Sequence, residues 1–303
     1  MNALVLTTSN ALPRRQQLVA PDWLARRLRT VCLIEVGYGD LGQFEQAHIP
    51  GAAYLDTACL EALPYFNKVD DASLLALLLA HGVRHDSTVV LYGRGSLAAA
   101  RAAHLMLYAG VRDVKLLDGG FGAWQAAHLP LEAGAAAPRR AARSFGAPFP
   151  GRPDFLIDLA GARAMLARPD AALVSIRTWS EYSGRTSGYS YIRARGDIPG
   201  ALWGRAGEEG DVNSMSHFQQ ADGRMRAPAE IARMWQLQGI GPARACAFYC
   251  GTGWRASLAF YYAWLMGWER IAVYDGGWFE WSASMLEWED ETNHSPCSMA
   301  AGR

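Results

Sequence analysis

The sequence predicts an α/β protein with two tandem domains, each a parallel sheet that carries helices on both faces. Three observations support this fold class: the length of 303 residues, long segments that repeat at a constant offset, and short apolar runs that alternate with segments of helical periodicity. The length favours two domains, because a domain holds roughly 100–200 residues. Half of the residues are hydrophobic, which is enough to form ordinary buried cores.

The strongest repeat joins residues 91–124 to residues 248–281. The first segment is LYGRGSLAAARAAHLMLYAGVRDVKLLDGGFGAW and the second is FYCGTGWRASLAFYYAWLMGWERIAVYDGGWFEW. They align without a gap, at an offset of 250 − 93 = 157 residues. Two further anchors precede each segment: HIPGA (48–52) with DIPGA (197–201), and VCLIEV (31–36) with ALVSI (172–176). A repeat of this length is too long for a solenoid, so we interpret it as a pair of duplicated domains.

The elements of the second repeat follow one another in a regular order. Residues 172–176 form an apolar run typical of a buried strand, and residues 228–240 are apolar at helical spacing. The order continues with a strand at 245–250, a helix at 255–267 that ends at a glycine, a strand and turn at 271–277, and a helix from 278. Apolar strands that alternate with helices imply a parallel sheet covered on both faces.

The domain boundaries follow from the repeat and from one stretch of biased composition. Residues 131–153 are rich in Ala, Pro and Arg and lack apolar periodicity, which is typical of a linker. We place the first domain at 15–135, the linker at 136–153 and the second domain at 154–290.

Charge and hydropathy argue against two classes of partner. Lys+Arg and Asp+Glu each number 29, so the chain has no net basic field of the kind that binds nucleic acid or an anionic membrane surface. No apolar run reaches the roughly 18 residues that span a bilayer. Residues 1–17 make a poor secretory signal, because their arginines follow the short apolar run instead of preceding it. We therefore expect neither a nucleic-acid nor a membrane partner.

The cysteines indicate a reducing environment. There are five, an odd number without CxxC pairs or clustered histidines: Cys32, Cys59, Cys246, Cys250 and Cys297. This pattern argues against both a disulfide framework and a zinc site. We expect a cytoplasmic protein without a metal site.

Cys250 is the candidate nucleophile. It closes a predicted strand, and ligands of parallel α/β sheets sit at the carboxyl ends of the strands. Gly251 and Gly253 bracket the following turn, so successive N–H groups can face one cavity and form an anion nest. The positive end of the next helix points to the same place and favours a thiolate. The alternative is a buried structural cysteine, which is common for an isolated cysteine.

The loop CGTGWR (250–255), the DIPGA motif and the segment YDGGWFEW (274–281) resemble the rhodanese sulfurtransferases. The resemblance runs from Leu18 to about Trp288 and is closest in the second half, which looks like the final domain of bacterial multi-domain sulfurtransferases. It implies two tandem rhodanese-like domains, a sulfurtransferase of the thiosulfate or 3-mercaptopyruvate type, and a persulfide on Cys250. The residues implied to cradle this persulfide are Gly251, Thr252, Gly253, Trp254 and Arg255.

The same resemblance makes the first domain look inactive. Gly93 stands where Cys250 stands in the second repeat, and Ala98 stands opposite Arg255. Because glycine offers no nucleophile, this domain cannot form a persulfide. The family commonly pairs an inactive first domain with an active second one, and the first domain would then supply one wall of the cleft.

Two residues of the repeat anchors are candidates for binding the substrate. Arg255 is expected to face the anionic donor or the persulfide, and the alternative is a helix-start residue that reaches solvent. His48 precedes the Ile-Pro turn of the first domain, where mercaptopyruvate-type relatives place a histidine near the domain interface. A structural histidine in a turn is the alternative for His48.

An insertion in the second domain supplies the third candidate, Arg185. From Arg177 to Asp197 the interval is 20 residues, whereas the corresponding interval in the first domain is 11. In two-domain sulfurtransferases the corresponding insertion brings substrate-binding arginines near the cysteine, and a planar guanidinium suits sulfonate or carboxylate oxygens. The insertion also carries Arg193 and Arg195, and a solvated loop is the alternative.

The leading hypothesis is therefore an enzyme. Thiosulfate, 3-mercaptopyruvate or a protein persulfide would give sulfur to Cys250, which passes it to a thiophilic acceptor such as cyanide or a thiol. No metal or organic cofactor is needed. The expected partners are a small anionic sulfur donor and, among proteins, a cysteine desulfurase or a sulfur-carrier protein.

Two other functional classes stay open. Phosphatases, including those of the same fold, use Cys-x5-Arg, whereas 255 − 250 = 5 makes the present loop Cys-x4-Arg. The shorter cradle suits a sulfur atom better than a tetrahedral phosphate. A non-catalytic binding module is the third class, and the first domain fits it.

Overall fold

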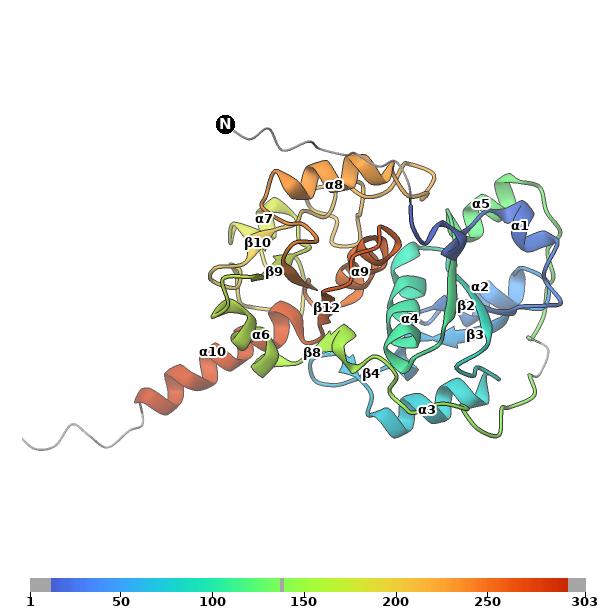
Figure 1. The fold of residues 1–303 in the computed structure, drawn as a ribbon, viewed down its shortest axis with the longest axis horizontal. Helices are drawn as coiled ribbons and strands as arrows, with labels where there is room; N and C mark the ends of the chain where they lie inside the picture. The colour runs from blue at the N-terminus through green and yellow to red at the C-terminus, as the bar shows by residue number, and fades with distance from the viewer. Residues whose placement is uncertain (1–11, 137–138, 294–303) are drawn as a thin grey trace, which may run out of the picture.

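The protein forms two lobes, one from each half of the chain (Figure 1). This computed structural model describes residues 12–136 and 139–293, with side chains described up to residue 285 at the C-terminal end. Each lobe contains a five-stranded parallel sheet with helices on both faces, so the predicted fold class is confirmed. Within the described ranges no helix is both long enough and apolar enough to cross a membrane.

The first lobe is built around the sheet β1-β7-β6-β2-β3. Its strands are β1 (Leu18–Val19), β2 (Cys32–Gly37), β3 (Ala53–Asp56), β6 (Thr88–Tyr92) and β7 (Asp113–Leu117). Its helices are α1 (Pro21–Ala25), α2 (Leu41–Gln46), α3 (Asp71–Ala80), α4 (Ser96–Ala109) and α5 (Gly120–Ala126). A separate antiparallel hairpin pairs β4 (Glu61–Ala62) with β5 (Asn67–Lys68).

The second lobe repeats this plan with the sheet β10-β9-β11-β12-β8. Its strands are β8 (Leu156–Ile157), β9 (Ala171–Ser175), β10 (Leu202–Trp203), β11 (Ala245–Tyr249) and β12 (Ile271–Tyr274). Its helices are α6 (Leu159–Leu166), α7 (Trp179–Tyr182), α8 (Pro228–Gln236), α9 (Trp254–Leu265) and α10 (Gly277–Asn293). The central strands β6 and β11 start 245 − 88 = 157 residues apart, so the offset of the sequence repeat is kept in the fold.

Successive side chains along each strand point to opposite faces of the sheet, and the two faces belong to different hydrophobic cores. On one face, β6 and β11 bury Leu91 and Phe248 in a single large core that also holds α4 and α9, which lie side by side at the centre of Figure 1. On the opposite faces, smaller cores lie under α1, α2 and α5 in the first lobe and under α6 and α10 in the second. The shared core therefore fixes the two lobes against each other.

The structure differs from the predicted elements mainly at their ends. Helix α8 ends at Gln236 instead of residue 240, because the chain turns at Gly239 with a positive φ of 72°. Strand β12 ends at Tyr274, and the turn 275–276 leads directly into α10. The pattern did not predict the short strands β1, β3 and β10 or the β4–β5 hairpin, since two to four residues are too few to show a periodicity.

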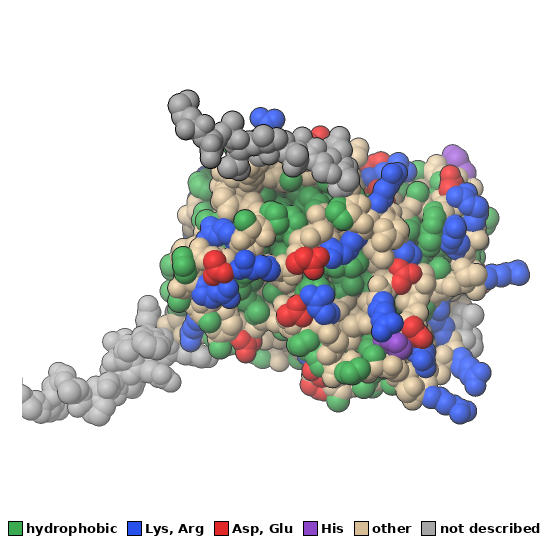
Figure 2. Space-filling view, viewed as in Figure 1, with side chains coloured by type: hydrophobic (Ala, Val, Ile, Leu, Met, Phe, Trp, Pro, Cys, Tyr) green, Lys and Arg blue, Asp and Glu red, His purple; other side chains and the backbone are tan. Residues whose placement is uncertain are grey.

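The proposed linker packs on the first lobe where the structure describes it. Phe145 is buried, its carbonyl accepts the backbone N–H of His85, and the N–H of Gly151 donates to the carbonyl of Ala109. The domain boundaries at 135 and 154 stay predictions. On the face shown in Figure 2, acidic and basic side chains are interspersed over the central part of the surface.

The two lobes exchange equivalent contacts. The backbone N–H of Lys68 in the first lobe donates to Asp275 Oδ2 of the second, at 2.6 Å. The N–H of Met225 in the second lobe donates to Asp118 Oδ1 of the first, at 2.9 Å. Both pairs obey the repeat, since 225 − 68 = 157 and 275 − 118 = 157. Each lobe thus donates a backbone N–H to the aspartate of the Asp-Gly-Gly turn in the other lobe.

Candidate active site

Cys250 lies directly after β11, at the carboxyl edge of the second sheet. It is 1% exposed. Cys246, on the same strand, is also buried, and its Sγ faces the carbonyl of Gly241 at 3.7 Å within the core. The two thiols therefore differ in surroundings: Cys246 lies among core side chains, whereas Cys250 opens the loop that leads into α9.

The loop after Cys250 turns its carbonyls outward and leaves its N–H groups unused. The carbonyls of Cys250 and Gly251 accept the N–H groups of Trp278 and Phe279, at 2.8 and 3.2 Å. Within the described residues, the backbone hydrogen bonds do not use the N–H groups of residues 251–253, although all three residues are buried. Buried N–H groups normally find an acceptor, so these N–H groups are available to an anion, as in an anion nest.

Two glycines make this loop possible. Gly253 caps α9 with a φ of 94°, a left-handed conformation that side chains disfavour. Gly277 starts α10, and a Cβ there would lie 2.5 Å from the carbonyl oxygen of Cys250. Close approach of α10 to the loop therefore requires glycine at 277.

The insertion of the second lobe covers the loop. A Cβ on Gly251 would lie 2.4 Å from the ring of Tyr189, so the tyrosine rests directly on the backbone next to Cys250. Tyr191 continues this cover, and its ring packs on that of Tyr189 with centroids 5.4 Å apart. Burial raises the pKa of Tyr191, while the Thr252 side chain lowers it in part.

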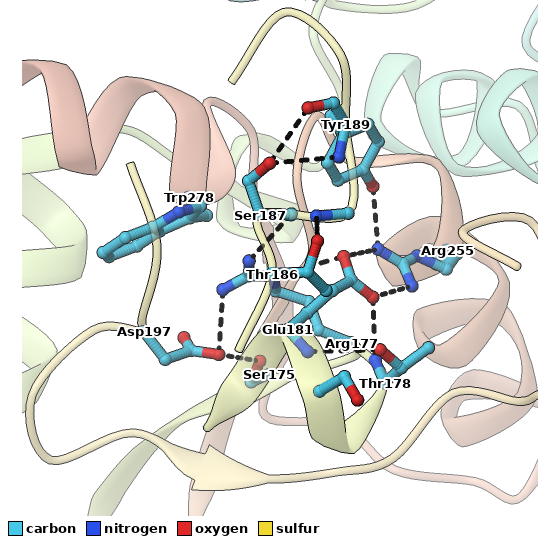
Figure 3. A network of polar contacts seen from close by, with 12 residues as sticks. Ser175, Arg177, Thr178, Glu181, Thr186, Ser187, Tyr189, Asp197, Arg255 and Trp278 are labelled. Atoms are coloured by element: carbon cyan, nitrogen blue, oxygen red, sulfur yellow. Dashed lines mark hydrogen bonds and ion pairs between the residues drawn. The ribbon is translucent and has the colours of Figure 1, made fainter. Parts of the chain in front are cut away.

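Arg255 points away from solvent into a buried network (Figure 3). Its Nη1 and Nη2 donate to Glu181 Oε2 and Oε1, both at 2.8 Å, and Nη2 also donates to the hydroxyl of Tyr189 at 2.8 Å. Arg255 and Glu181 are each 1% exposed. A bidentate, buried pair of this kind fixes the start of α9 and the position of the tyrosine above the loop.

The network continues across the carboxyl edge of the sheet. Arg177 donates to Asp197 Oδ2 at 3.1 Å and to the carbonyl of Gly196 at 2.6 Å, and its Nε lies 3.5 Å from Glu181. Burial raises the pKa of Glu181, but the hydrogen bonds and charges of Arg255 and Arg177 outweigh it and hold that pKa below its ordinary value. The Glu181 carboxylate therefore stays charged between two guanidinium groups.

The first lobe contributes directly to the loop. Glu61 of the hairpin accepts the indole N–H of Trp254 at 2.8 Å and Arg101 Nε at 3.0 Å. Arg101, which is 0% exposed, also lies 2.7 Å from Asp275 Oδ1. The ring of Trp254 meets that of Tyr38 edge to face, with centroids 6.0 Å apart. The loop is thus held from both lobes.

The structure places the other predicted residues as follows. Arg185 lies in the insertion and is exposed, as are Arg193 and Arg195. His48 is buried in the first lobe, stacked on Phe44 with ring centroids 3.9 Å apart and with Nδ1 2.9 Å from the Phe44 carbonyl. Substrate contact by Arg185, His48 or Arg255 stays a prediction. The contacts of Arg255 support a positioning role instead.

Several residues at the site were not foreseen. They are Glu181, Tyr189, Tyr191, Glu61 and Arg101. One local signal exists: Thr178 and Glu181 form a capping box at the start of α7, and its sequence spacing is visible. No group of three or more His, Cys, Asp or Glu side chains within the described residues could hold a metal ion.

Both halves of the chain match one family of domains. Residues 20–127 and 158–284 match the rhodanese-like domain. Over 282 residues the chain is 48% identical to the thiosulfate sulfurtransferase YnjE of Escherichia coli, in an alignment that covers 90% of this chain and 64% of that protein. Over 293 residues it is 33% identical to a probable 3-mercaptopyruvate sulfurtransferase of Pseudomonas aeruginosa, covering 93% and 96%. The chain therefore spans less than two thirds of the E. coli protein.

Solved structures show the same similarity in three dimensions. The crystal structure of YnjE matches with a TM-score of 0.86, covering 90% of this chain and 67% of that chain. A structure of EanB with a cysteine persulfide and ergothioneine matches with a TM-score of 0.86 at 36% identity, covering 90% and 70%. The anaerobic ergothioneine biosynthesis enzyme from Chlorobium limicola, in complex with its natural substrate trimethyl histidine, matches with a TM-score of 0.85 at 37% identity, covering 90% and 69%.

Proposed function

The chain belongs to the rhodanese family of thiosulfate and 3-mercaptopyruvate sulfurtransferases, and from this premise we propose that it transfers sulfane sulfur through a persulfide on Cys250. The observation that carries the proposal is the loop 251–253, which is buried and whose N–H groups are not used by backbone hydrogen bonds among the described residues. Such N–H groups stabilise an anion that forms next to them.

The reaction has two half-reactions. The Cys250 thiolate attacks the outer sulfur of an anionic donor such as thiosulfate, the donor's S–S bond breaks, and sulfite leaves with the electron pair. In the second half-reaction an acceptor nucleophile attacks the outer sulfur of the persulfide, and the thiolate of Cys250 is regenerated. In both states the negative charge lies on sulfur in front of the loop N–H groups, so one cradle serves both steps.

Arg255 acts in this proposal as a positioning residue. Its guanidinium is engaged by Glu181 and Tyr189, so it holds the loop and its cover in place. The same engagement argues against a phosphatase, because a phosphate-binding arginine must present its N–H groups to the phosphate oxygens. The exposed Arg185, in the insertion next to the cover of Cys250, is the candidate for contacting the donor.

The donor and the compartment belong to the same proposal. Thiosulfate, 3-mercaptopyruvate and a protein persulfide are the candidate donors, and a cysteine desulfurase or a sulfur-carrier protein is the candidate protein partner. We propose a reducing compartment, the cytoplasm, for a protein whose catalytic group is a thiol.

Steady-state kinetics test the proposal. We expect cyanide-dependent sulfur transfer with ping-pong kinetics from at least one of thiosulfate and 3-mercaptopyruvate. Cys250→Ser should abolish it, while Cys246→Ser should keep most of it because that thiol lies in the core. Turnover that survives Cys250→Ser, or Cys250-dependent hydrolysis of aryl phosphates without sulfur transfer, would reject the proposal.

A second candidate concerns the acceptor. The persulfidated cysteine of EanB and the tyrosine varied in that structure have the same separation as Cys250 and Tyr191. A threonine varied in a related EanB structure with hercynine follows that cysteine by two positions, as Thr252 follows Cys250. In this chain Tyr191 packs on Tyr189, which lies on the backbone beside Cys250. These matches favour a trimethylated histidine as an alternative sulfur acceptor.

Sulfur transfer to a trimethylated histidine would proceed in one step with the following bond changes. The outer persulfide sulfur would bond to an imidazole carbon, the S–S electron pair would return to Cys250, and the ring C–H proton would leave to solvent. Persulfidated protein incubated with trimethyl histidine should give a product that is heavier by one sulfur, and Tyr191→Phe should slow its formation. If cyanide is converted but trimethyl histidine is not, this acceptor is rejected and the sulfurtransferase proposal stands.

A further inference from the structure

A large cavity lies between the two lobes, at the carboxyl edge of the first sheet and not at Cys250. Its volume is about 750 Å³, within the range of small-molecule sites. It opens at the carboxyl edge of the first sheet, at the loop where Gly93 replaces the cysteine, and side chains of both lobes line it, among them Asp118, Tyr38, Leu258 and Trp254.

The cavity is open because the first lobe lacks the insertion. In the second lobe, Tyr189 of that insertion lies on the loop beside Cys250. In the first lobe the interval from Gly37 to His48 is only 48 − 37 = 11 residues, and Tyr38 at the edge of the cavity is 60% exposed. The equivalent of the closed catalytic site is therefore accessible from solvent.

This cavity is not a second sulfur site. A Cβ on Gly93 would lie 2.5 Å from the carbonyl oxygen of Gly95 and 2.9 Å from that of Val36. Oxygens thus occupy the space that a cysteine side chain would need. A ligand of this cavity has to be recognised by other groups.

The informative group is Asp118, the counterpart of Asp275. Both carboxylates accept one backbone N–H from the opposite lobe, from Met225 and Lys68 respectively. Asp275 has in addition a guanidinium, that of Arg101, 2.7 Å from Oδ1. The residue that the repeat places opposite Arg101 is 101 + 157 = 258, a leucine. Asp118 therefore keeps the N–H partner of its counterpart but has lost the cation.

The space of the missing cation is the cavity itself, since Leu258 and Asp118 both line it. Among the lining residues three are acidic, Asp40, Asp118 and Asp222, and two are basic, Arg94 and Arg224.

Neither basic residue forms an ion pair with Asp118. The guanidinium of Arg94 is held by the buried Glu35 at 2.9 Å, and that of Arg224 lies 3.6 Å from Asp222. Asp118 therefore has no directly paired cation among the described residues. Burial raises its pKa more than the Met225 N–H and the charge of Arg224 lower it.

We propose that this cavity binds a small organic cation, an amine, amidine or guanidine compound, whose charged group pairs with Asp118 where Arg101 pairs with Asp275. The rings of Tyr38 and Trp254 at its rim suit a flat or apolar body attached to that charge. Trp254 also belongs to the loop of Cys250, so an occupied cavity touches the same tryptophan that Glu61 holds.

Isothermal titration calorimetry of the full chain, without any sulfur donor, tests this inference. The probe is benzamidine, a planar cation with a ring, and the matched neutral probe is benzamide. We expect saturable 1:1 binding of benzamidine and binding of benzamide that is weaker by about tenfold or more, the cost of losing a charged hydrogen bond.

Three variants locate the site. Asp118→Asn keeps the acceptor for the Met225 N–H, and it should weaken benzamidine binding by about tenfold or more while sulfur transfer is unchanged. Asp222→Asn removes an equal charge at an exposed position and should weaken binding by less than about threefold. Leu258→Arg should abolish binding, because it recreates the pair of Arg101 with Asp275.

Three results would overturn the inference: equal binding of benzamidine and benzamide, full binding by Asp118→Asn, or no saturable binding of benzamidine below about 10 mM. None of these measurements depends on the activity of Cys250, so the inference and the proposed function fail separately.

Discussion

The loops at Gly93 and Cys250 occupy the same place in two sheets of the same topology, and in both the following helix donates an N–H to the loop carbonyl, yet the two loops are enclosed differently. At Cys250 the insertion covers the backbone, and the hairpin of the first lobe holds Trp254. At Gly93 the corresponding edge opens into a cavity of about 750 Å³.

The difference shows that the repeated core positions the loop but does not enclose it. The sheet and the following helix are common to both lobes, whereas the groups that enclose Cys250 come from segments outside that core. Glu181 and Tyr189 lie on the insertion side of the second lobe, and Glu61 comes from the first lobe. The first lobe is therefore part of the environment of Cys250, even though its own loop has Gly93 in place of the cysteine.

The largest loss of stability is expected when the buried ion pair between Arg255 and Glu181 beside the Cys250 loop is broken. Glu181→Gln should lower the free energy of unfolding by about 3–5 kcal/mol, because it leaves the guanidinium of Arg255 buried without its charge partner. Chemical denaturation measures this change. Glu209→Gln is the matched control: this exposed glutamate accepts two N–H groups of the same helix, and its loss should cost less than about 1 kcal/mol. Equal effects of the two variants would mean that the buried pair does not hold the loop.

The next variant asks whether the first loop can be converted. Gly93→Cys should lower stability by about 1–3 kcal/mol, because its Cβ would lie 2.5 Å from the Gly95 oxygen. In a Cys250→Ser background it should restore no sulfur transfer. Gly95→Ala is the control, since a Cβ at Gly95 meets nothing within 4 Å. Sulfur transfer by the double variant would show that the cysteine alone distinguishes the two lobes.

A smaller effect is expected at the insertion that only the second loop has. Arg185→Ala should raise KM for thiosulfate and 3-mercaptopyruvate severalfold and change kcat less, because it removes binding that is equal in the ground and transition states. Arg193→Ala and Arg195→Ala provide controls from the same exposed segment. If all three variants keep the kinetic constants of the native chain, the insertion covers Cys250 but has no role in donor binding.

The last effect is a pH dependence, and it concerns the contact from the first lobe. Burial raises the pKa of Glu61 to about 7, so the folded chain holds this proton in a pH range where the unfolded chain has released it. The stability contributed by this group is therefore full at acidic pH and is lost as the pH rises through about 7.

Glu61→Gln removes this titration. The native chain should lose stability between about pH 5 and pH 8 as Glu61 releases its proton, and the variant should lack this loss. The difference in free energy of unfolding, variant minus native, should therefore increase over that pH range. Denaturation curves at several pH values measure the difference. Parallel pH profiles of the two proteins would contradict the assigned titration.

The sequence predicted what is local and repeated. Apolar runs and glycine positions predicted the central strands and the start of α9, and the family resemblance was confirmed by both rhodanese-like matches. The contacts that enclose Cys250 could not be predicted from the sequence, because Arg255 pairs with a residue 74 positions away and Trp254 with one 193 positions away. No periodicity connects such residues, and they meet only when the two lobes fold together. The contacts of Arg255 with Glu181 and Tyr189 favour a positioning role, and contact of Arg255 with a donor stays a prediction.

Intact-mass spectrometry after incubation with thiosulfate tests the central claim most directly, because it reports the persulfide itself. We expect the native chain and Cys246→Ser to gain the mass of one sulfur, a gain that cyanide reverses, and Cys250→Ser to gain nothing. A persulfide on the Cys250→Ser chain, or none on the native chain with any of thiosulfate, 3-mercaptopyruvate and a persulfidated protein donor, would contradict the account.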